Sequence, residues 1–135
     1  MTKLTIIGAG SAVFTKNIVT DILSLDKFKQ MEIALQDIDP IRLKASHELL
    51  EVISKKLNAF PKISSHTNRR ESLSHADFVQ TTIQVGGYKP STIIDFDIPK
   101  EFGLQQTIAD TLGIGGIMRG LRTIPVLLDI AKDII

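Results

Sequence analysis

The sequence contains no cysteine among its 135 residues. It therefore has neither a disulfide framework nor a thiolate metal site, and any metal would have to bind histidine or carboxylate side chains. Long apolar runs are also missing, because the longest, such as residues 4–10 and 124–128, are far shorter than the ~20 residues that span a bilayer. No charged and then apolar signal segment opens the chain, so we expect a cytoplasmic protein without a membrane partner.

The chain also has no large excess of positive or negative charge. The chain has 16 Lys and Arg residues against 15 Asp and Glu residues, for a net charge of +1. Its basic residues occur singly or in pairs among acids, as at Lys55-Lys56 and Arg69-Arg70, so we expect no nucleic-acid partner. The hydrophobic share of 43% is that of a domain with an ordinary core.

Two kinds of segment alternate along the first part of the chain. Segments rich in β-favouring residues predict four strands, over residues 3–8, 31–36, 62–67 and 77–83. Between them the sequence predicts a helix from Ser11, a helix from Pro40 to about Leu57, and one helical turn over residues 69–74. This alternation favours an α/β fold, a Rossmann-like doubly wound parallel sheet with helices on both faces. We expect one domain over residues 1–135.

The apolar residues of the first two helices predict which side packs on the sheet. In the first helix this face comprises Val13, Phe14, Ile18, Ile22 and Leu25. In the second helix it comprises Ile41, Leu43, Leu49, Leu50, Ile53 and Leu57. Asp39 should cap the second helix, with Pro40 in the first helical position, where its missing N–H group costs nothing.

The composition changes after residue 83. Two glycine-rich segments, residues 84–90 and 110–116, flank a predicted helix over 91–102, and we expect them to be site-forming loops. A last helix should begin near Ile117, with Pro125 as a kink or a late start. It is still apolar where the sequence stops, which suggests part of a larger protein and predicts self-association or a homo-oligomer.

The turn after the first strand is the first candidate site. Gly8-Ala9-Gly10-Ser11-Ala12-Val13 lies where a dinucleotide-binding fold has its phosphate turn. Gly8 can adopt the tight turn, and Gly10 would let the backbone approach a pyrophosphate at the positive end of the helix. Val13 replaces the usual third glycine or alanine, so the alternative is a strand-to-helix turn that merely needs glycine.

Asp37, at the end of the second strand, is the second candidate. A carboxylate there would accept hydrogen bonds from the hydroxyls of an adenosine ribose. It would repel a 2′-phosphate, which favours NAD over NADP. The alternative is a plain turn at the end of the strand.

The remaining polar candidates are less specific. We interpret His47, His66 and His75 as solvated surface imidazoles, because no pair of them has the spacing of metal ligands. Arg119 and Arg122 are open to two interpretations. They can pair with acids on a helix face, or they can hold an anionic or polyhydroxyl ligand beside the glycine-rich loop.

Four segments together resemble glycoside hydrolase family 4, and they occur in the order of that family. They are residues 8–14 (GAGSAVF), 35–40 (LQDIDP), 84–88 (QVGGY) and 106–125, which begins QTIADTLG and ends TIP. The resemblance spans the whole chain. The Asp-Thr-Leu-Gly and Gly-Gly-Tyr segments look most like the α-galactosidase (melibiase) branch.

This resemblance implies an NAD-dependent hydrolysis of α-galactosides. In the family, NAD⁺ accepts a hydride from C3 of the sugar, a base removes the C2 proton, and the glycosidic oxygen leaves by elimination. Water then adds and the hydride returns. A divalent metal, commonly manganese, polarises the C2 and C3 oxygens as a Lewis acid.

The resemblance also gives roles to matching residues. It implies that Gly8, Gly10 and Ser11 form the pyrophosphate turn, that Asp37 is the ribose ligand, and that Gln84, Val85 and Gly86 lie near the nicotinamide. Asp110 and Arg119 match the sugar-facing segment. Ser91 stands where we expect cysteine in close relatives, and we assign it no catalytic role.

The family's metal-binding cysteine and histidine, its substrate asparagine and its proton-abstracting base all match positions beyond Ile135. We therefore expect an NAD-binding portion that holds no metal and is inactive by itself. Two alternatives stay open, a 2-hydroxy-acid dehydrogenase-like domain and a non-catalytic dinucleotide-binding remnant. Such dehydrogenases normally carry an arginine-bearing loop after the fourth strand, where this chain has only Lys89 as a basic residue.

Overall fold

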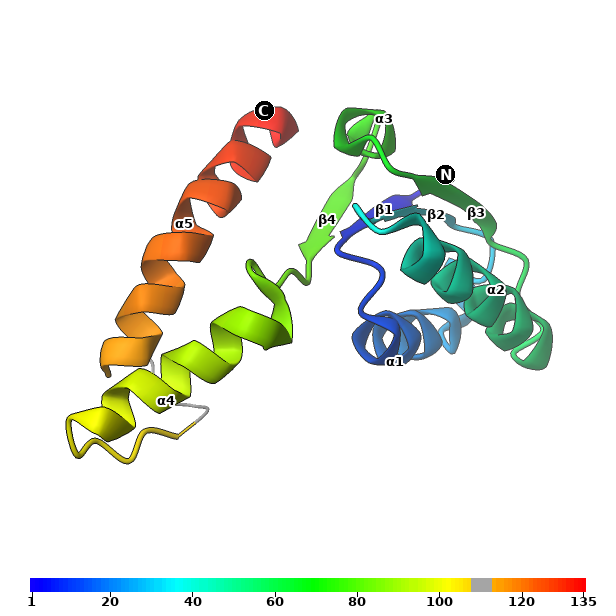
Figure 1. Cartoon of the computed structure of the whole chain (residues 1–135). Helices are drawn as coiled ribbons and strands as arrows, with labels where there is room; N and C mark the ends of the chain where they lie inside the picture. The colour runs from blue at the N-terminus through cyan, green and yellow to red at the C-terminus, as the bar shows by residue number, and fades with distance from the viewer. Residues whose placement is uncertain (108–112) are drawn as a thin grey trace. The chain divides into compact units, whose positions relative to one another are not determined.

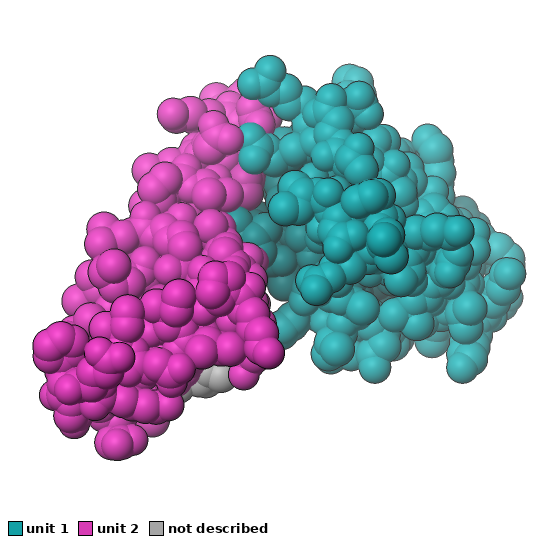
Figure 2. Space-filling model, viewed as in Figure 1, with its two compact units in different colours: residues 1–83 teal, residues 84–135 magenta. Residues whose placement is uncertain are grey.

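A computed structural model describes residues 1–107 and 113–135. The chain divides into two compact units, residues 1–83 and residues 84–135, which Figure 2 draws in teal and magenta. The assignment of the whole chain to a single NAD-binding domain stays a prediction.

The first unit is built on a parallel sheet of four strands (Figure 1). The strands are β1 (Lys3–Ile7), β2 (Glu32–Gln36), β3 (Lys62–His66) and β4 (Phe78–Thr81), and their order in the sheet is β3-β2-β1-β4. The chain thus leaves β1 toward β2 and β3 on one side and returns with β4 on the other. The carboxyl ends of β1 and β4 therefore meet at a topological switch point, where open α/β sheets bind their ligands.

Helices cover both faces of this sheet, as predicted. Between the strands lie α1 (Ala12–Leu23), the 3-10 helix η1 (Asp26–Phe28), α2 (Pro40–Lys56) and α3 (Arg69–Leu73). On one face, Leu4 and Ile6 of β1 belong to the main hydrophobic core, which also takes residues from α1 and α2. On the other face, the Thr5 hydroxyl donates a hydrogen bond of 2.8 Å to the carbonyl of Ser72 in α3. The prediction of a doubly wound α/β sheet is confirmed.

The predicted packing face of α1 is correct only in part, because Ile22 packs against the core and Ile18 is half-buried, but the fully buried side chains are others. The residues that α1 buries are Thr15, Val19 and Leu23, spaced by four, whereas Val13 and Phe14 are 65% and 59% exposed. The cause is polar, because the Thr15 hydroxyl donates to the Ala9 carbonyl over 2.9 Å and so turns a threonine inward. A pattern built from apolar residues alone cannot contain this contact.

The α2 helix shows the same effect in a milder form. It buries Leu43 and Leu50 as predicted, but two serines share this face and Ile41 is 80% exposed. The Ser46 hydroxyl donates to the Ala9 carbonyl over 2.7 Å, so both helices are tied to the same turn. This shared acceptor fixes the turn after β1 relative to both helices.

The second unit consists of an irregular helical turn and two helices. They are η2 (Gly87–Thr92), α4 (Ile93–Glu101) and α5 (Ile114–Ile134). The last helix begins at Ile114, earlier than the predicted Ile117, and contains Pro125 in its interior. Helices α4 and α5 pack closely, since a Cβ added to Gly115 would lie 2.0 Å from the Asp95 carbonyl oxygen. Within the described residues, no helix is long and apolar enough to cross a membrane.

Candidate functional site

The turn after β1 is held between the ends of its two neighbouring strands. Its first residue, Gly8, has a φ of +81°, and an added Cβ would lie 2.1 Å from the Thr82 carbonyl oxygen beyond β4. On the other side, the N–H groups of Gly8 and Ala9 both donate to the Gln36 carbonyl over 2.9 Å. Only glycine fits at position 8, because L-residues rarely adopt this conformation and no space exists for a side chain.

The carboxylate of Asp37 is fixed beside this turn. One of its oxygens accepts a hydrogen bond of 2.7 Å from the Gly10 N–H, and the other accepts one of 2.9 Å from the Asp39 N–H. The side chain remains partly exposed. Each carboxylate oxygen can accept more than one hydrogen bond, so the two oxygens keep lone pairs for a ligand with paired hydroxyls.

Gly10 has a role that the sequence did not predict. An added Cβ would lie 2.7 Å from the nearer Asp37 carboxylate oxygen and 2.9 Å from Cβ of Arg42. The missing side chain therefore lets α2 and the Asp37 carboxylate approach the turn. The groups that approach Gly10 in the structure belong to the protein itself, and the approach of a pyrophosphate stays a prediction.

Asp39 caps α2 as predicted. Its carboxylate accepts hydrogen bonds from the N–H groups of Ile41 and Arg42, over 2.9 and 3.1 Å. It also pairs with the Arg42 guanidinium at 3.5 Å. Because Asp39 is used by the helix end, Asp37 is the acid that remains available to a ligand at the end of β2.

The start of α1 has the character of an anion-binding helix end. Ser11 is its N-cap residue, but the Ser11 side chain makes no capping hydrogen bond, and the first turn contains no acidic residue. The positive end of the helix is thus not neutralised from within the helix. The Ser11 and Ala12 N–H groups donate to carbonyls of the turn, over 3.1 and 3.0 Å, so it is the helix dipole that favours a phosphate at this position.

The segment Gln84, Val85 and Gly86 forms a defined loop within the second unit. The Gln84 amide donates to the Thr92 hydroxyl, and the Val85 carbonyl accepts a hydrogen bond of 3.1 Å from the Arg122 guanidinium. Gly86 has a φ of +85°, and an added Cβ would lie 2.0 Å from the Ser91 hydroxyl oxygen. The loop is therefore tied to both η2 and α5.

For Arg122, the first of the two interpretations is correct, because this arginine pairs with an acid of a neighbouring helix. It forms a two-point ion pair with Asp95 of α4, with N–O distances of 3.3 and 2.6 Å. Asp95 is only 7% exposed. The sequence did not identify Asp95, because residues 93–98 contain two acids among apolar residues and only the fold shows that Asp95, not Asp97, is buried and needs a cation.

Arg119 has a different environment from Arg122. It is exposed and borders a hollow of about 380 Å³ in the second unit. The hollow has polar neighbours in Thr92, Gln106 and Thr123, together with backbone at Gly116. Phe96, Ile124 and Leu127 also line the hollow, so its surface is mostly apolar with a few polar groups. Asp110, the other predicted sugar-facing residue, lies outside the described residues.

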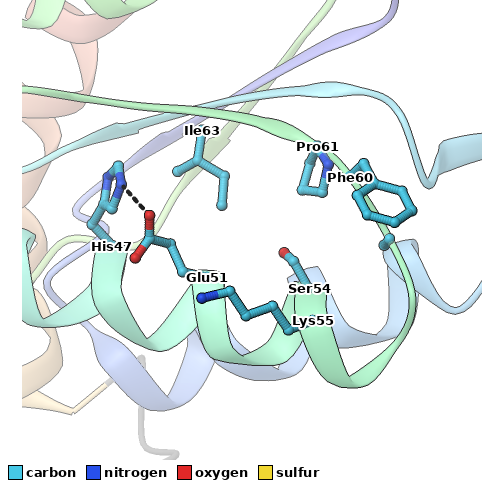
Figure 3. Close-up of a pocket in the computed structure, with 8 residues that line it drawn as sticks. His47, Glu51, Ser54, Lys55, Phe60, Pro61 and Ile63 are labelled. Carbon is cyan, nitrogen blue, oxygen red and sulfur yellow. Dashed lines mark ion pairs between the residues drawn. The ribbon is translucent and has the colours of Figure 1, made fainter.

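A second hollow, of about 320 Å³, lies between α2 and the segment that leads into β3 (Figure 3). His47 and Glu51 face one another at its end with an N–O distance of 3.8 Å, and His47 also bonds the Ser65 hydroxyl at 2.7 Å. Phe60 and Pro61 mark the opposite end, before the start of β3. Ligands of open α/β sheets bind at the carboxyl ends of strands, so this hollow does not fit the dinucleotide.

The predicted exposure of the histidines is correct for His75 alone. His75 is exposed, whereas His47 and His66 are half-buried, and each of these two lies beside a serine and a glutamate. Among residues 1–107 and 113–135, no group of three His, Cys, Asp or Glu side chains is placed to hold a metal ion.

The sequence of this chain is similar to those of known proteins. The family described as Family 4 glycosyl hydrolase matches residues 3–135. An α-galactosidase of Bacillus subtilis (strain 168) is 56% identical over 133 residues, which are 98% of this chain and 31% of that enzyme. An α-galactosidase of Rhizobium meliloti (strain 1021) is 38% identical, over 98% of this chain and 27% of that enzyme.

Solved structures share the fold. A 6-phospho-α-glucosidase from gut microorganisms, in complex with NAD and glucose-6-phosphate, superposes with a TM-score of 0.84 at 28% identity, over 98% of this chain and 30% of that one. A 6-phospho-α-glucosidase in complex with NAD and Mn²⁺ superposes equally well, at 24% identity. The chain spans about a third of the length of the relatives it matches.

Proposed function

This chain belongs to glycosyl hydrolase family 4, and we propose that it is the NAD-binding part of an enzyme that hydrolyses α-galactosides. The observation that supports NAD as the cofactor is the Asp37 carboxylate, which the Gly10 and Asp39 amides orient at the switch point of the sheet. Identities of 56% and 38% to two α-galactosidases support the substrate class. Membership in this family leaves the dehydrogenase-like alternative without support.

The residues of the first unit fit a dinucleotide. The Asp37 oxygens would accept hydrogen bonds from the two ribose hydroxyls, and the uncapped start of α1 beside Ser11 would receive the pyrophosphate. Gly8 and Gly10 allow the turn and the Asp37 carboxylate to take these positions, because a Cβ at either glycine would collide with the protein. NAD, when bound, supplies the hydride acceptor for oxidation of the sugar.

The residues of the second unit are proposed to act on the nicotinamide and sugar side. Gln84, Val85 and Gly86 form the loop for the nicotinamide, and the Arg122–Asp95 pair holds that loop through the Val85 carbonyl. We assign Arg119, and with it Asp110, to the sugar-facing side. Arg119 is exposed and borders the hollow of the second unit, which supports this assignment.

A divalent metal, manganese in the first place, is proposed only for the longer enzyme. The described residues do not fit such an ion, because they contain no group of three possible ligands. We propose that the 135-residue chain alone binds NAD and releases no galactose from α-galactosides when NAD⁺ and Mn²⁺ are supplied.

Calorimetric titration of the 135-residue chain with NAD⁺ tests the cofactor. We expect saturable binding that weakens at least tenfold in Asp37→Ala, because hydrogen bonds to a charged acceptor contribute about 1.5–3 kcal/mol. Asp21→Ala, which removes an exposed carboxylate from α1, is the matched control and should leave the affinity unchanged. Absence of binding in a folded chain, or equal affinity in Asp37→Ala, would contradict the proposal.

A further inference from the structure

The peptide group between Ala9 and Gly10 is held at both of its ends. Its carbonyl oxygen, on Ala9, accepts two side-chain hydrogen bonds, from the Thr15 hydroxyl of α1 over 2.9 Å and from the Ser46 hydroxyl of α2 over 2.7 Å. Its N–H group, on Gly10, donates to the Asp37 carboxylate over 2.7 Å. One peptide group therefore connects two helices to the candidate ribose ligand.

Both hydroxyls are buried and reach a carbonyl outside their own helices. Thr15 is 1% exposed, and Ser46 and Ala9 are fully buried. A carbonyl oxygen has two lone pairs, and here both are used by buried donors, although one hydrogen bond would satisfy it. Serine and threonine inside a helix often bond a carbonyl of the same helix, as Ser54 of α2 does with Leu50. Thr15 and Ser46 instead converge on one atom of the turn after β1.

The direction of the Asp37 carboxylate depends on this peptide group. One carboxylate oxygen accepts from the Asp39 N–H, two residues away, which is a local contact that the end of β2 can form alone. The other oxygen accepts from the Gly10 N–H, 27 residues away, and this bond ties the carboxylate to the turn. Donors at a carbonyl polarise the peptide group and strengthen its N–H as a donor, most of all where water is excluded. A rotation of the peptide plane would turn the Gly10 N–H away from Asp37.

We propose that Thr15 and Ser46 are positioning residues for Asp37, because they fix the Ala9–Gly10 peptide plane and with it the carboxylate that binds the adenosine 2′-hydroxyl. This inference rests on the proposed function, since it assumes that Asp37 binds the ribose. A carboxylate that already has its bound orientation loses little freedom when the ligand arrives, so its orientation adds to affinity. The two hydroxyls thus set how strongly the site prefers a ribose to a deoxyribose, without touching the ligand.

Calorimetric titration of the 135-residue chain with NAD⁺, and with the NAD⁺ analogue that lacks the adenosine 2′-hydroxyl, tests this inference. We expect the wild type to prefer NAD⁺ at least about tenfold. The double variant of Thr15→Val and Ser46→Ala loses both hydroxyls and should prefer NAD⁺ less than about twofold. Each single variant leaves one donor on the carbonyl and should lower the preference about threefold. The affinity for the analogue should change less than about twofold in all three variants.

Two control variants and one direct measurement separate positioning from stability. Thr15→Ser keeps the hydroxyl and loses a buried methyl group, so it should lower stability but keep the preference within about twofold of the wild type. Ser54→Ala removes a buried hydroxyl that bonds within α2 and should leave the preference unchanged. In amide hydrogen exchange followed by NMR, the Gly10 amide of the double variant should exchange about tenfold faster relative to the Gly8 amide, which donates to the Gln36 carbonyl.

The outcomes separate this inference from the proposed function. If the wild type prefers NAD⁺ and the double variant keeps that preference, the positioning role is wrong and the NAD site stands; if the double variant does not fold, the two single variants decide in the same way. An equal loss of affinity for NAD⁺ and for the analogue shows a merely structural role and also overturns the inference. If the wild type binds both dinucleotides equally, Asp37 does not bind the 2′-hydroxyl and the inference fails while NAD binding stands. If a folded wild type binds neither dinucleotide, both proposals fail.

Discussion

Single backbone positions decide whether the turn after β1 can exist. Gly8→Ala places a methyl group 2.1 Å from the Thr82 carbonyl oxygen and forces a non-glycine residue into φ +81°. We expect a loss of about 2–4 kcal/mol in the free energy of unfolding, measured by urea titration, because conformational strain and a backbone collision add. Gly87→Ala is the matched control, since Gly87 has φ +67° but no atom within 4 Å of an added Cβ. It should lose only about 1 kcal/mol, and equal losses in the two variants would contradict the collision at Gly8.

A single ion pair has a similar importance in the second unit. Arg122→Met leaves the Asp95 carboxylate, 7% exposed, without its cation and removes the donor to the Val85 carbonyl. We expect a loss of about 2–3 kcal/mol in urea unfolding, because a buried charge without a partner is costly. In the double variant with Asp95→Leu, the loss should be smaller than the sum of the two single losses. Lys100→Met breaks the exposed pair with Asp97 and, as a control, should change stability by less than about 0.5 kcal/mol. A sum that is fully additive would show that the two side chains do not interact.

At the scale of elements, the rotation of α1 about its axis gives the sharpest test. Leu23→Ala should cost about 2–5 kcal/mol, because Leu23 is fully buried in the core. Phe14→Ala should cost less than about 0.5 kcal/mol, although phenylalanine is the larger side chain, because Phe14 is 59% exposed. Thermal or urea unfolding followed by circular dichroism measures both. The reverse order would restore the face predicted from the sequence.

The strands and the start of α2 were predictable because their signals are local. The buried strand β1 is an uninterrupted β-favouring segment, and the Asp39-Pro40 pair carries the cap of α2 in two adjacent residues. The face of α1 was not predictable, because it depends on a hydrogen bond from Thr15 to a carbonyl six residues away. Asp95 was missed for a similar reason, since its partner Arg122 is 27 residues distant along the chain. Tertiary polar contacts of this kind leave no periodic pattern.

The candidate site was also predictable only in part. Gly8, Gly10 and Asp37 were identified from their positions after strands, because parallel strands bring their carboxyl ends to one edge of a sheet. That the Gly10 amide binds Asp37 required the folded chain, because the two residues meet only when β1 and β2 pair in register. The sequence therefore predicted that these residues lie at one edge of the sheet, and the structure supplied the hydrogen bond between Gly10 and Asp37.

At the scale of the whole molecule, the long apolar side of α5 predicts association between copies of this chain. Five side chains between 40% and 70% exposed recur along one side of this helix, namely Ile117, Met118, Leu121, Ile124 and Leu128. The other side of α5 is occupied, since Gly115 and Ile130 are buried. A contiguous apolar surface of several turns is unfavourable in water, and a second copy offers a matching surface.

Sedimentation velocity of the purified 135-residue chain measures this association. We expect a dimer or larger species. The variant with Leu121→Lys and Leu128→Lys should sediment as a monomer, because charges on both sides of a self-contact repel. Its circular dichroism spectrum should be unchanged. Lys55→Glu and Lys56→Glu, which alter exposed residues at the end of α2, should leave the association unchanged. A wild-type chain that sediments as one monomeric species over the accessible concentrations would contradict the expectation, because the apolar side of α5 would then be tolerated in water without a partner.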